Sequence, residues 1–184
     1  MSPAAPRVVS PRIDPGVPVF ALGRYAGARR QVIVAMKDRG RSDLVTPLAL
    51  ALALGVQRLL EWGLLDVPLT IVPAPTRSWA ARRRGGDPVT RIATLATAAH
   101  PHVTVVRALR MKALARDSVG LSTSARERNI AGRVLLGGQP GKLVGTEVVL
   151  VDDIVTTGAT ARESVRALRA AGIRVAAVLA LASA

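Results

Sequence analysis

The sequence has no cysteine, only two histidines and only four aromatic residues among its 184 residues. Without cysteine, the chain has no disulfide scaffold, no cysteine-ligated zinc or iron–sulfur site and no thiol nucleophile. Two histidines are too few for a histidine-rich metal cage. The scarcity of aromatic rings also removes most of the stacking platforms on which proteins hold single-stranded nucleic acid.

Acidic residues are scarce as well. Twelve Asp and Glu residues stand against 26 Lys and Arg residues, which gives a formal net charge of +14. An excess of this size favours an anionic partner. Because stacking side chains are few, phosphate, pyrophosphate or a nucleotide is a better candidate ligand than a single strand of nucleic acid.

The sequence predicts neither a secretory leader nor a membrane span. The first 19 residues carry five prolines and lack the apolar stretch of a signal peptide. We expect residues 1–18 to form a flexible arm and residues 19–184 to form one domain, whose core comes from an apolar content of 49%. The longest apolar run, Leu44 to Gln57, has 14 uncharged residues, fewer than the roughly 18 to 20 of a membrane helix. This run predicts a buried helix, and we expect a cytoplasmic protein without a membrane partner.

Short β-branched runs alternate with Ala-, Leu- and Arg-rich stretches at helical spacing, which is typical of an α/β fold with a parallel sheet. We predict that Asp43 and Asp87 are the N-caps of two helices. Residues 108–122 have no clear period and are expected to form a loop. The predicted strands are 19–25, 69–72, 103–107, 147–151 and 173–180, and the predicted helices are 28–37, 43–62, 88–99, 126–132 and 159–171.

The most informative string is VVLVDDIVTTGAT, from Val148 to Thr160. Its four apolar residues predict a buried strand, and two carboxylates, Asp152 and Asp153, follow at the strand's carboxyl end. The Thr-Thr-Gly-x-Thr stretch then leads into a helix start, where free backbone N–H groups and hydroxyls suit a phosphate. The carboxylates accept hydrogen bonds from a vicinal diol or help to position a divalent cation.

Each piece of this string also has a purely structural reading. Two aspartates can simply cap a helix, and Thr-Thr-Gly can simply form a turn. The pieces in order, within a strand–turn–helix context, favour a site for a phosphorylated sugar.

The string resembles the phosphoribosyl pyrophosphate (PRPP) binding signature of type I phosphoribosyltransferases, and the chain resembles the ComF family in particular. Segments similar to three others of that family stand in the same order, at Tyr25–Leu44, Ile71–Val89 and Arg116–Gly132. The four-cysteine zinc-binding segment with which ComF-like proteins usually begin is absent. The resemblance implies the parallel-sheet type I phosphoribosyltransferase fold, with helices on both faces and a small hood region.

The resemblance also implies roles for individual residues. Asp152 and Asp153 would be catalytic, would hold the ribose hydroxyls and could ligate Mg²⁺, the expected cofactor. Lys37 falls near the end of a predicted helix, where a cation is favourable on its own account, and we assign it no part in the site. The 5′-phosphate would lie on Thr156, Thr157, Gly158, Ala159 and Thr160, and the pyrophosphate on Ala74, Pro75, Thr76, Arg77 and Arg84.

Three functions remain open at this point. The first is an enzyme that transfers the phosphoribosyl group of PRPP to a nucleobase or other nitrogen acceptor and releases pyrophosphate with the help of Mg²⁺. The second is a non-catalytic PRPP- or nucleotide-binding module of the ComF type, involved in DNA uptake or in the regulation of nucleotide salvage. The third is a nucleic-acid-binding protein that uses its basic surface, although nucleic acid is not a required partner of the first two. The sequence leaves the oligomeric state open, a homodimer included.

Overall fold

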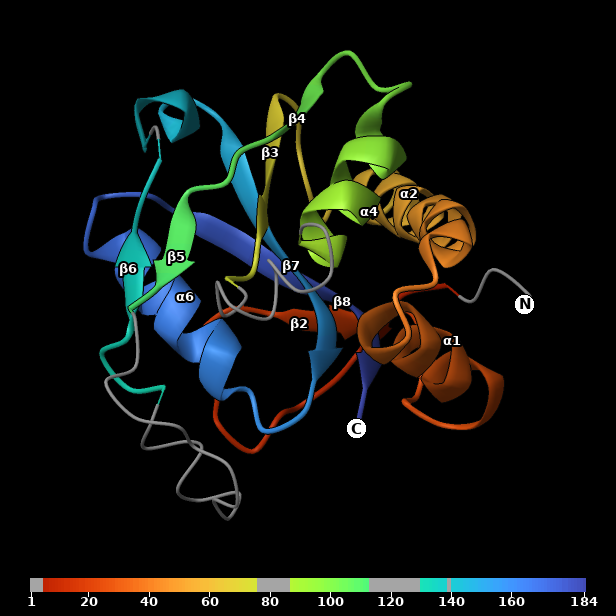
Figure 1. Ribbon diagram of the computed structural model, residues 1–184. Helices are drawn as coiled ribbons and strands as arrows, with labels where there is room; N and C mark the ends of the chain where they lie inside the picture. Colours follow the sequence, from red (N-terminus) through yellow and green to blue (C-terminus); the bar gives the residue numbers. More distant parts are fainter. Residues whose placement is uncertain (1–4, 76–86, 113–129, 139) are drawn as a thin grey trace.

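The computed structural model describes residues 5–75, 87–112, 130–138 and 140–184. Its centre is a six-stranded sheet in the order β1-β2-β8-β7-β3-β4, in which every neighbouring pair is parallel except β1 and β2 (Figure 1). The predicted α/β class with a parallel sheet is therefore confirmed. The strands are β1 (Arg7–Val8), β2 (Val19–Ala21), β3 (Leu69–Pro73), β4 (Val103–Val105), β5 (Leu109–Met111), β6 (Val134–Leu136), β7 (Glu147–Val155) and β8 (Val175–Ser183). The helices are α1 (Gly27–Asp38), α2 (Val45–Glu61), α4 (Pro88–Thr97) and α6 (Ala159–Arg169), with short 3-10 helices at Ser42–Leu44 and Pro140–Leu143.

Apolar side chains of β7 alternate between the two faces of the sheet and join two separate cores. On one face, Val149 clusters with Leu52 of α2 and Ile92 of α4. On the other face, Leu150 clusters with Leu168 of α6. The antiparallel pair β5–β6 packs on the α6 side, away from α2 and α4 (Figure 1). Because successive residues of a strand point to opposite faces, one apolar run supplies both cores.

The carboxylates of the Val148–Thr160 string lie within a strand rather than after it. We predicted that the strand ends at Val151, but β7 continues to Val155 because its last residues pair with the equally long β8. Asp152 pairs with Ala180, and Ile154 pairs with Ala182. The two carboxylates therefore follow the alternation of a strand, which matters for the site.

Residues 7–16, which we expected to belong to a flexible arm, are bonded to the rest of the domain at several points. β1 pairs with β2, and the N–H of Ile13 donates to the carbonyl of Thr157 at 2.8 Å. Arg169 of α6 donates to the carbonyl of Gly16 at 2.9 Å. The predicted helical and strand patterns missed this segment because its proline-rich sequence has no period.

The two predicted helix caps had different outcomes. Asp87 is the N-cap of α4, and its side chain accepts from the N–H of Val89, as predicted. Asp43 is not the cap of α2, which begins at Val45 after a 3-10 turn. The Asp43 carboxylate instead pairs with Arg41 at 2.6 Å, because the tighter turn leaves its side chain facing that guanidinium.

The helical segment Ser42–Glu61 is long and apolar enough, by length and composition alone, to cross a membrane. The predicted helix is present but is buried along one face only, where Leu48, Leu52, Val56 and Leu59 lie in the core. Leu50 and Leu54 lie on its exposed side.

The sequence also missed three short strands, β1, β5 and β6. Each has two or three residues, too few to show a period of two. β5 begins the stretch 108–122 that we expected to be a loop. The predicted helix 126–132 lies mostly outside the described residues.

The packing of α2 makes a stability prediction. Leu52→Ala should lower the free energy of unfolding by about 2–5 kcal/mol, because Leu52 is fully buried between the helix and the sheet. Leu50→Ala, on the same helix but with Leu50 63% exposed, should change it by less than about 0.5 kcal/mol. Urea denaturation of both variants measures the difference, and equal effects would contradict the orientation of α2.

Candidate functional site

The sheet changes its winding direction between β3 and β7. From β3 the chain passes through α4 to β4 on one side, and from β7 it passes through α6 to β8 on the other. Since β3 and β7 are parallel neighbours, the segments that follow them leave from the same edge and diverge. The carboxyl ends of parallel strands at such a divergence are the usual ligand position in open α/β sheets.

The turn between β7 and α6 is shaped by Gly158 and is supported by residues 11–13. Gly158 has a φ of 88°, which places it in the left-handed region. A Cβ at this position would overlap the carbonyl oxygen of Ile13. Glycine is therefore required twice, by the backbone angle and by the close approach of the segment whose N–H binds Thr157.

The start of α6 is suited to an anion. The N-cap residue, Gly158, has no side chain to cap the helix, and the first turn has no acidic residue. The hydroxyl of Thr157 accepts from the N–H of Ala159 at 3.4 Å, a long contact. The first N–H groups of a helix lack intrahelical acceptors and carry the positive end of the helix dipole. Thr156, Thr157 and Thr160 place three hydroxyls around the same turn.

These groups line a cavity of about 330 Å³. The volume lies at the lower end of the range for small-molecule sites. Every residue that we predicted to bind the 5′-phosphate belongs to the lining, and Asp152 joins them from β7. The lining residues are Ile130, Asp152, Ile154, Val155, Thr156, Thr157, Gly158, Ala159, Thr160 and Ala161.

Only one of the two predicted carboxylates reaches this cavity. Asp152 is part of its lining, and Asp153 is not. Asp153 is 7% exposed and lies toward the opposite face of the sheet, as the alternation of β7 requires. The resemblance implies that both side chains hold the ribose hydroxyls, and of the two only Asp152 lines this cavity.

Lys37 of α1 is the partner of Asp153. Its Nζ lies 2.6 Å from Oδ2 of Asp153, and the two side chains are 28% and 10% exposed. The N–H of Asp153 in turn donates to Oδ1 of Asp152 at 2.8 Å. Sequence reasoning missed Lys37, because a lysine near a helix end has a sufficient explanation in the helix dipole.

The surroundings of Asp152 disfavour its charge. Burial, and next the neighbouring charge of Asp153, raise the pKa of Asp152 to about 7, while Lys37 opposes the rise. The Asp152 carboxyl therefore titrates near neutral pH and not near the value of about 4 that is usual for aspartate.

The first predicted pyrophosphate-binding residues lie beside the carboxylates. The N–H of Ala74, directly after β3, donates to the carbonyl of Val151 at 2.7 Å. Ala74 is buried, and Pro75 is half-buried. Thr76, Arg77 and Arg84 lie outside the described residues.

A second cavity, of about 250 Å³, shares Val155 and Thr156 with the first. Ser10, Arg24 and Ser183 contribute its other polar side chains. It has no helix start and no acidic side chain in its lining, so the larger cavity is the better candidate for a phosphorylated sugar.

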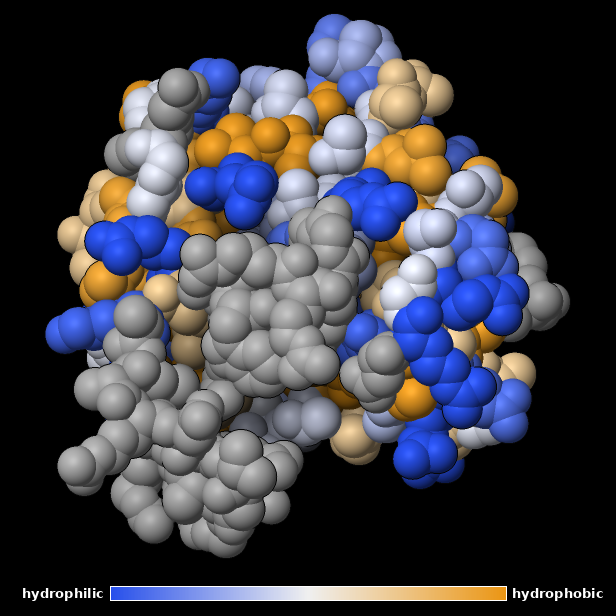
Figure 2. Space-filling model, viewed as in Figure 1, coloured by the Kyte–Doolittle hydropathy of each residue, from blue (hydrophilic) through white to orange (hydrophobic). Residues whose placement is uncertain are grey.

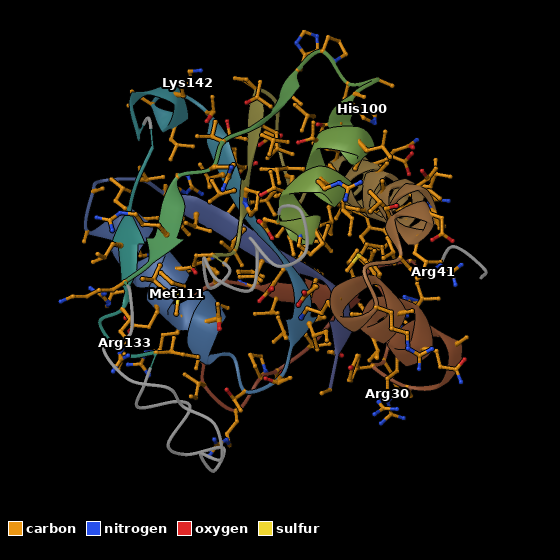
Figure 3. All side chains as sticks on the ribbon, viewed as in Figure 1. Arg30, Arg41, His100, Met111, Arg133 and Lys142 are labelled. Carbon is orange, nitrogen blue, oxygen red and sulfur yellow. The ribbon has the colours of Figure 1, made fainter. Side chains whose placement is uncertain are left out.

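Several charged and titratable residues lie away from the larger cavity. Arg30 and Arg41 point outward from the region of α1, over which hydrophilic residues gather (Figures 2 and 3). The carbonyl of His102 accepts from the N–H of Leu69, at the start of β3. His100 and Lys142 lie at the same far end of the sheet (Figure 3). This end is opposite to the edge that carries Asp152.

The described residues hold no group of three or more His, Cys, Asp and Glu side chains that could cage a metal ion. Asp152 is a carboxylate whose side chain faces the cavity, and the ammonium of Lys37 neutralises Asp153. A magnesium ion usually keeps several waters and takes one or two carboxylates together with ligand phosphates. Among the described residues, Asp152 is therefore the cavity-lining carboxylate that could serve as such a ligand.

Neither the known protein-family models nor the curated proteins give a match to this chain.

The turn makes the first prediction about the site. Gly158→Ala should cost at least about 1 kcal/mol more unfolding free energy than Gly172→Ala, because both positions have positive φ but only Gly158 also meets backbone. A Cβ at Gly172 would meet nothing within 4 Å. Thermal or urea unfolding measures both variants, and equal losses would show that Ile13 does not press on the turn.

The raised pKa of Asp152 leads to a second prediction, on how the stability of the fold changes with pH. Between about pH 4 and pH 7 the unfolded chain ionises Asp152 while the folded protein retains the proton, so this group reduces the stability of the fold as pH rises. Asp152→Asn should therefore have a higher free energy of unfolding than the wild type. The difference between the two free energies should increase by about 1–3 kcal/mol from pH 5 to pH 8. Urea denaturation across this range measures the gap.

Asp43 provides a control, because its pKa is shifted in the opposite direction from that of Asp152. Its hydrogen bond with Arg41 holds the pKa of Asp43 below its usual value, so this pair stabilises the fold above the unfolded-state pKa and loses that effect in acid. Asp43→Asn should gain nothing at pH 8. A gap for Asp152→Asn that stays constant with pH would contradict the burial of its charge.

Proposed function

We propose that this protein binds PRPP and transfers its phosphoribosyl group to a nitrogen acceptor, such as a nucleobase, with release of pyrophosphate. The observation that carries the proposal is the cavity that joins the α6 turn to Asp152 at the edge of β7. The type I phosphoribosyltransferase fold, with its small hood region, and the resemblance to the ComF family belong to the same proposal.

The cavity offers two kinds of chemistry at once. The N–H groups and hydroxyls of residues 156–160 suit the 5′-phosphate of the ligand, since a helix start favours a dianion. The Asp152 carboxylate is an acceptor-only group when ionised and suits the ribose hydroxyls. A phosphate alone needs no carboxylate beside it, so the combination favours a sugar phosphate over a simple anion.

The chain's residues would assist the transfer by orientation and by charge. Anchoring the 5′-phosphate at the α6 turn and the hydroxyls at Asp152 fixes the sugar at two points, which lowers the entropic cost of reaching the transition state. When ionised, Asp152 would also favour the positive charge that develops on an oxocarbenium-like sugar, so its interaction with a sugar held at this cavity would strengthen in the transition state. The segment after Ala74 begins beside these groups and is the candidate position for the pyrophosphate.

Magnesium fits this proposal as an ion that arrives with the pyrophosphate, and Asp152 would be the residue of this cavity to hold it. When bound, it would neutralise charge that develops on the leaving pyrophosphate. Asp153 is less suited to it, because Lys37 already supplies a cation there.

Binding of PRPP tests the proposal. Calorimetry with Mg²⁺ should show that Asp152→Asn weakens PRPP binding by about 10- to 100-fold, the cost of hydrogen bonds to a charged group. Asp66→Asn, which removes an exposed carboxylate before β3, is the charge-matched control and should bind as the wild type does. The double variant Asp152→Asn/Asp153→Asn should show no binding, and wild-type affinity in that variant would refute the proposal.

Pyrophosphate release separates the enzyme from a binding module. Incubation with PRPP, Mg²⁺ and a panel of purine, pyrimidine and amine acceptors should release pyrophosphate with at least one acceptor. Measured PRPP binding without release from any acceptor would instead favour the non-catalytic ComF-type module. Salt-sensitive DNA binding with no effect of PRPP would favour a nucleic-acid-binding protein.

A further inference from the structure

The two neighbouring aspartates of β7 have unequal surroundings. Asp152 lines the cavity, whereas Asp153 lies on the other face and is almost fully buried. A buried carboxylate without a partner is costly, so Asp153 requires the ammonium of Lys37 that lies 2.6 Å away.

Lys37 is placed for this contact by α1. It lies in the last turn of the helix, where the carbonyl ends favour a cation, and its side chain is only 28% exposed. Of the other cations of α1, Arg29 donates to the carbonyl of Leu181 in β8 at 3.4 Å. Arg30 is exposed and points away from the sheet (Figure 3). The pair therefore ties the end of α1 to β7 directly behind the cavity.

The contact continues from Asp153 to the cavity itself. The backbone N–H of Asp153 donates to Oδ1 of Asp152 at 2.8 Å. Oδ1 of the Asp152 carboxylate is thereby held by the backbone, and the carboxylate lies at the wall of the cavity. The direction of the Asp152 side chain thus depends on the position of the Asp153 backbone, which Lys37 holds through the Asp153 side chain.

We propose that Lys37 is a positioning residue whose ion pair with Asp153 fixes the β7 backbone so that Asp152 alone meets the hydroxyls of a bound sugar phosphate. This inference rests on the proposed function and assigns the selectivity of the site for a diol to three residues on two elements. Lys37 acts through Asp153 and does not touch the ligand.

The test compares ribose 5-phosphate with 2-deoxyribose 5-phosphate, which lacks one hydroxyl of the diol. The wild type should bind the ribose compound about 10- to 100-fold more tightly. Lys37→Met should reduce this ratio at least about fivefold, while the affinity for inorganic phosphate, which needs only the α6 turn, stays unchanged. Lys37→Arg should keep the ratio within about twofold, because it restores the cation. Arg30→Met, which removes an exposed cation from the same helix, should leave it unchanged.

Lys37→Met leaves Asp153 buried without a partner and can lose stability for that reason. The double variant Lys37→Met/Asp153→Asn removes both charges and should unfold at a temperature close to that of the wild type, while its ratio stays low. If the double variant kept the wild-type preference for ribose 5-phosphate over 2-deoxyribose 5-phosphate, the proposal would be overturned. The preference would then not depend on the ion pair between Lys37 and Asp153.

The remaining outcomes separate this inference from the proposed function. A wild-type ratio that persists in Lys37→Met would overturn the role of Lys37 and leave the diol site intact. A wild type that binds inorganic phosphate but does not discriminate ribose from deoxyribose would overturn both, because Asp152 would then not contact the diol.

Discussion

The pairing of β7 with β3 on one side and with β8 on the other is the constraint on which the rest of the structure depends. It completes the backbone hydrogen bonds of a fully buried strand, which could not otherwise leave water. It also places two cores on opposite faces of the same four residues, 148–151. The edge at which β3 and β7 end then becomes the place where the chain diverges, and the cavity lies there.

The extension of β7 to Val155 decides in which directions the Asp152 and Asp153 side chains point. If the strand ended at Val151, both aspartates would belong to a loop and could turn toward one ligand. Within the strand they must alternate, so that Asp152 faces the cavity and Asp153 faces α1. The ion pair with Lys37 is the consequence, because the second carboxylate is buried outside the lining of this cavity and requires a cation.

Residues 11–13, in the segment before β2, support the turn that follows β7. Their backbone packs against Gly158, and the N–H of Ile13 donates to the carbonyl of Thr157, so this segment supports the turn between β7 and α6. Such support from rigid neighbours is what an anion site needs, since a loose turn would lose the convergence of its N–H groups. The shape of the site therefore depends on residues that are far from it in sequence.

The sequence by itself determined the alternation of strands and helices, the cap at Asp87 and the run of residues from Asp152 to Thr160. These features depend on local spacing, turn chemistry and the requirements of a helix start, which neighbouring residues specify. Only the tertiary structure decided where β7 ends, which face each aspartate takes, that Lys37 reaches Asp153, and that the segment around Ile13 supports the turn. Each of these depends on pairing or packing between residues far apart in the chain, and no local pattern encodes such a contact.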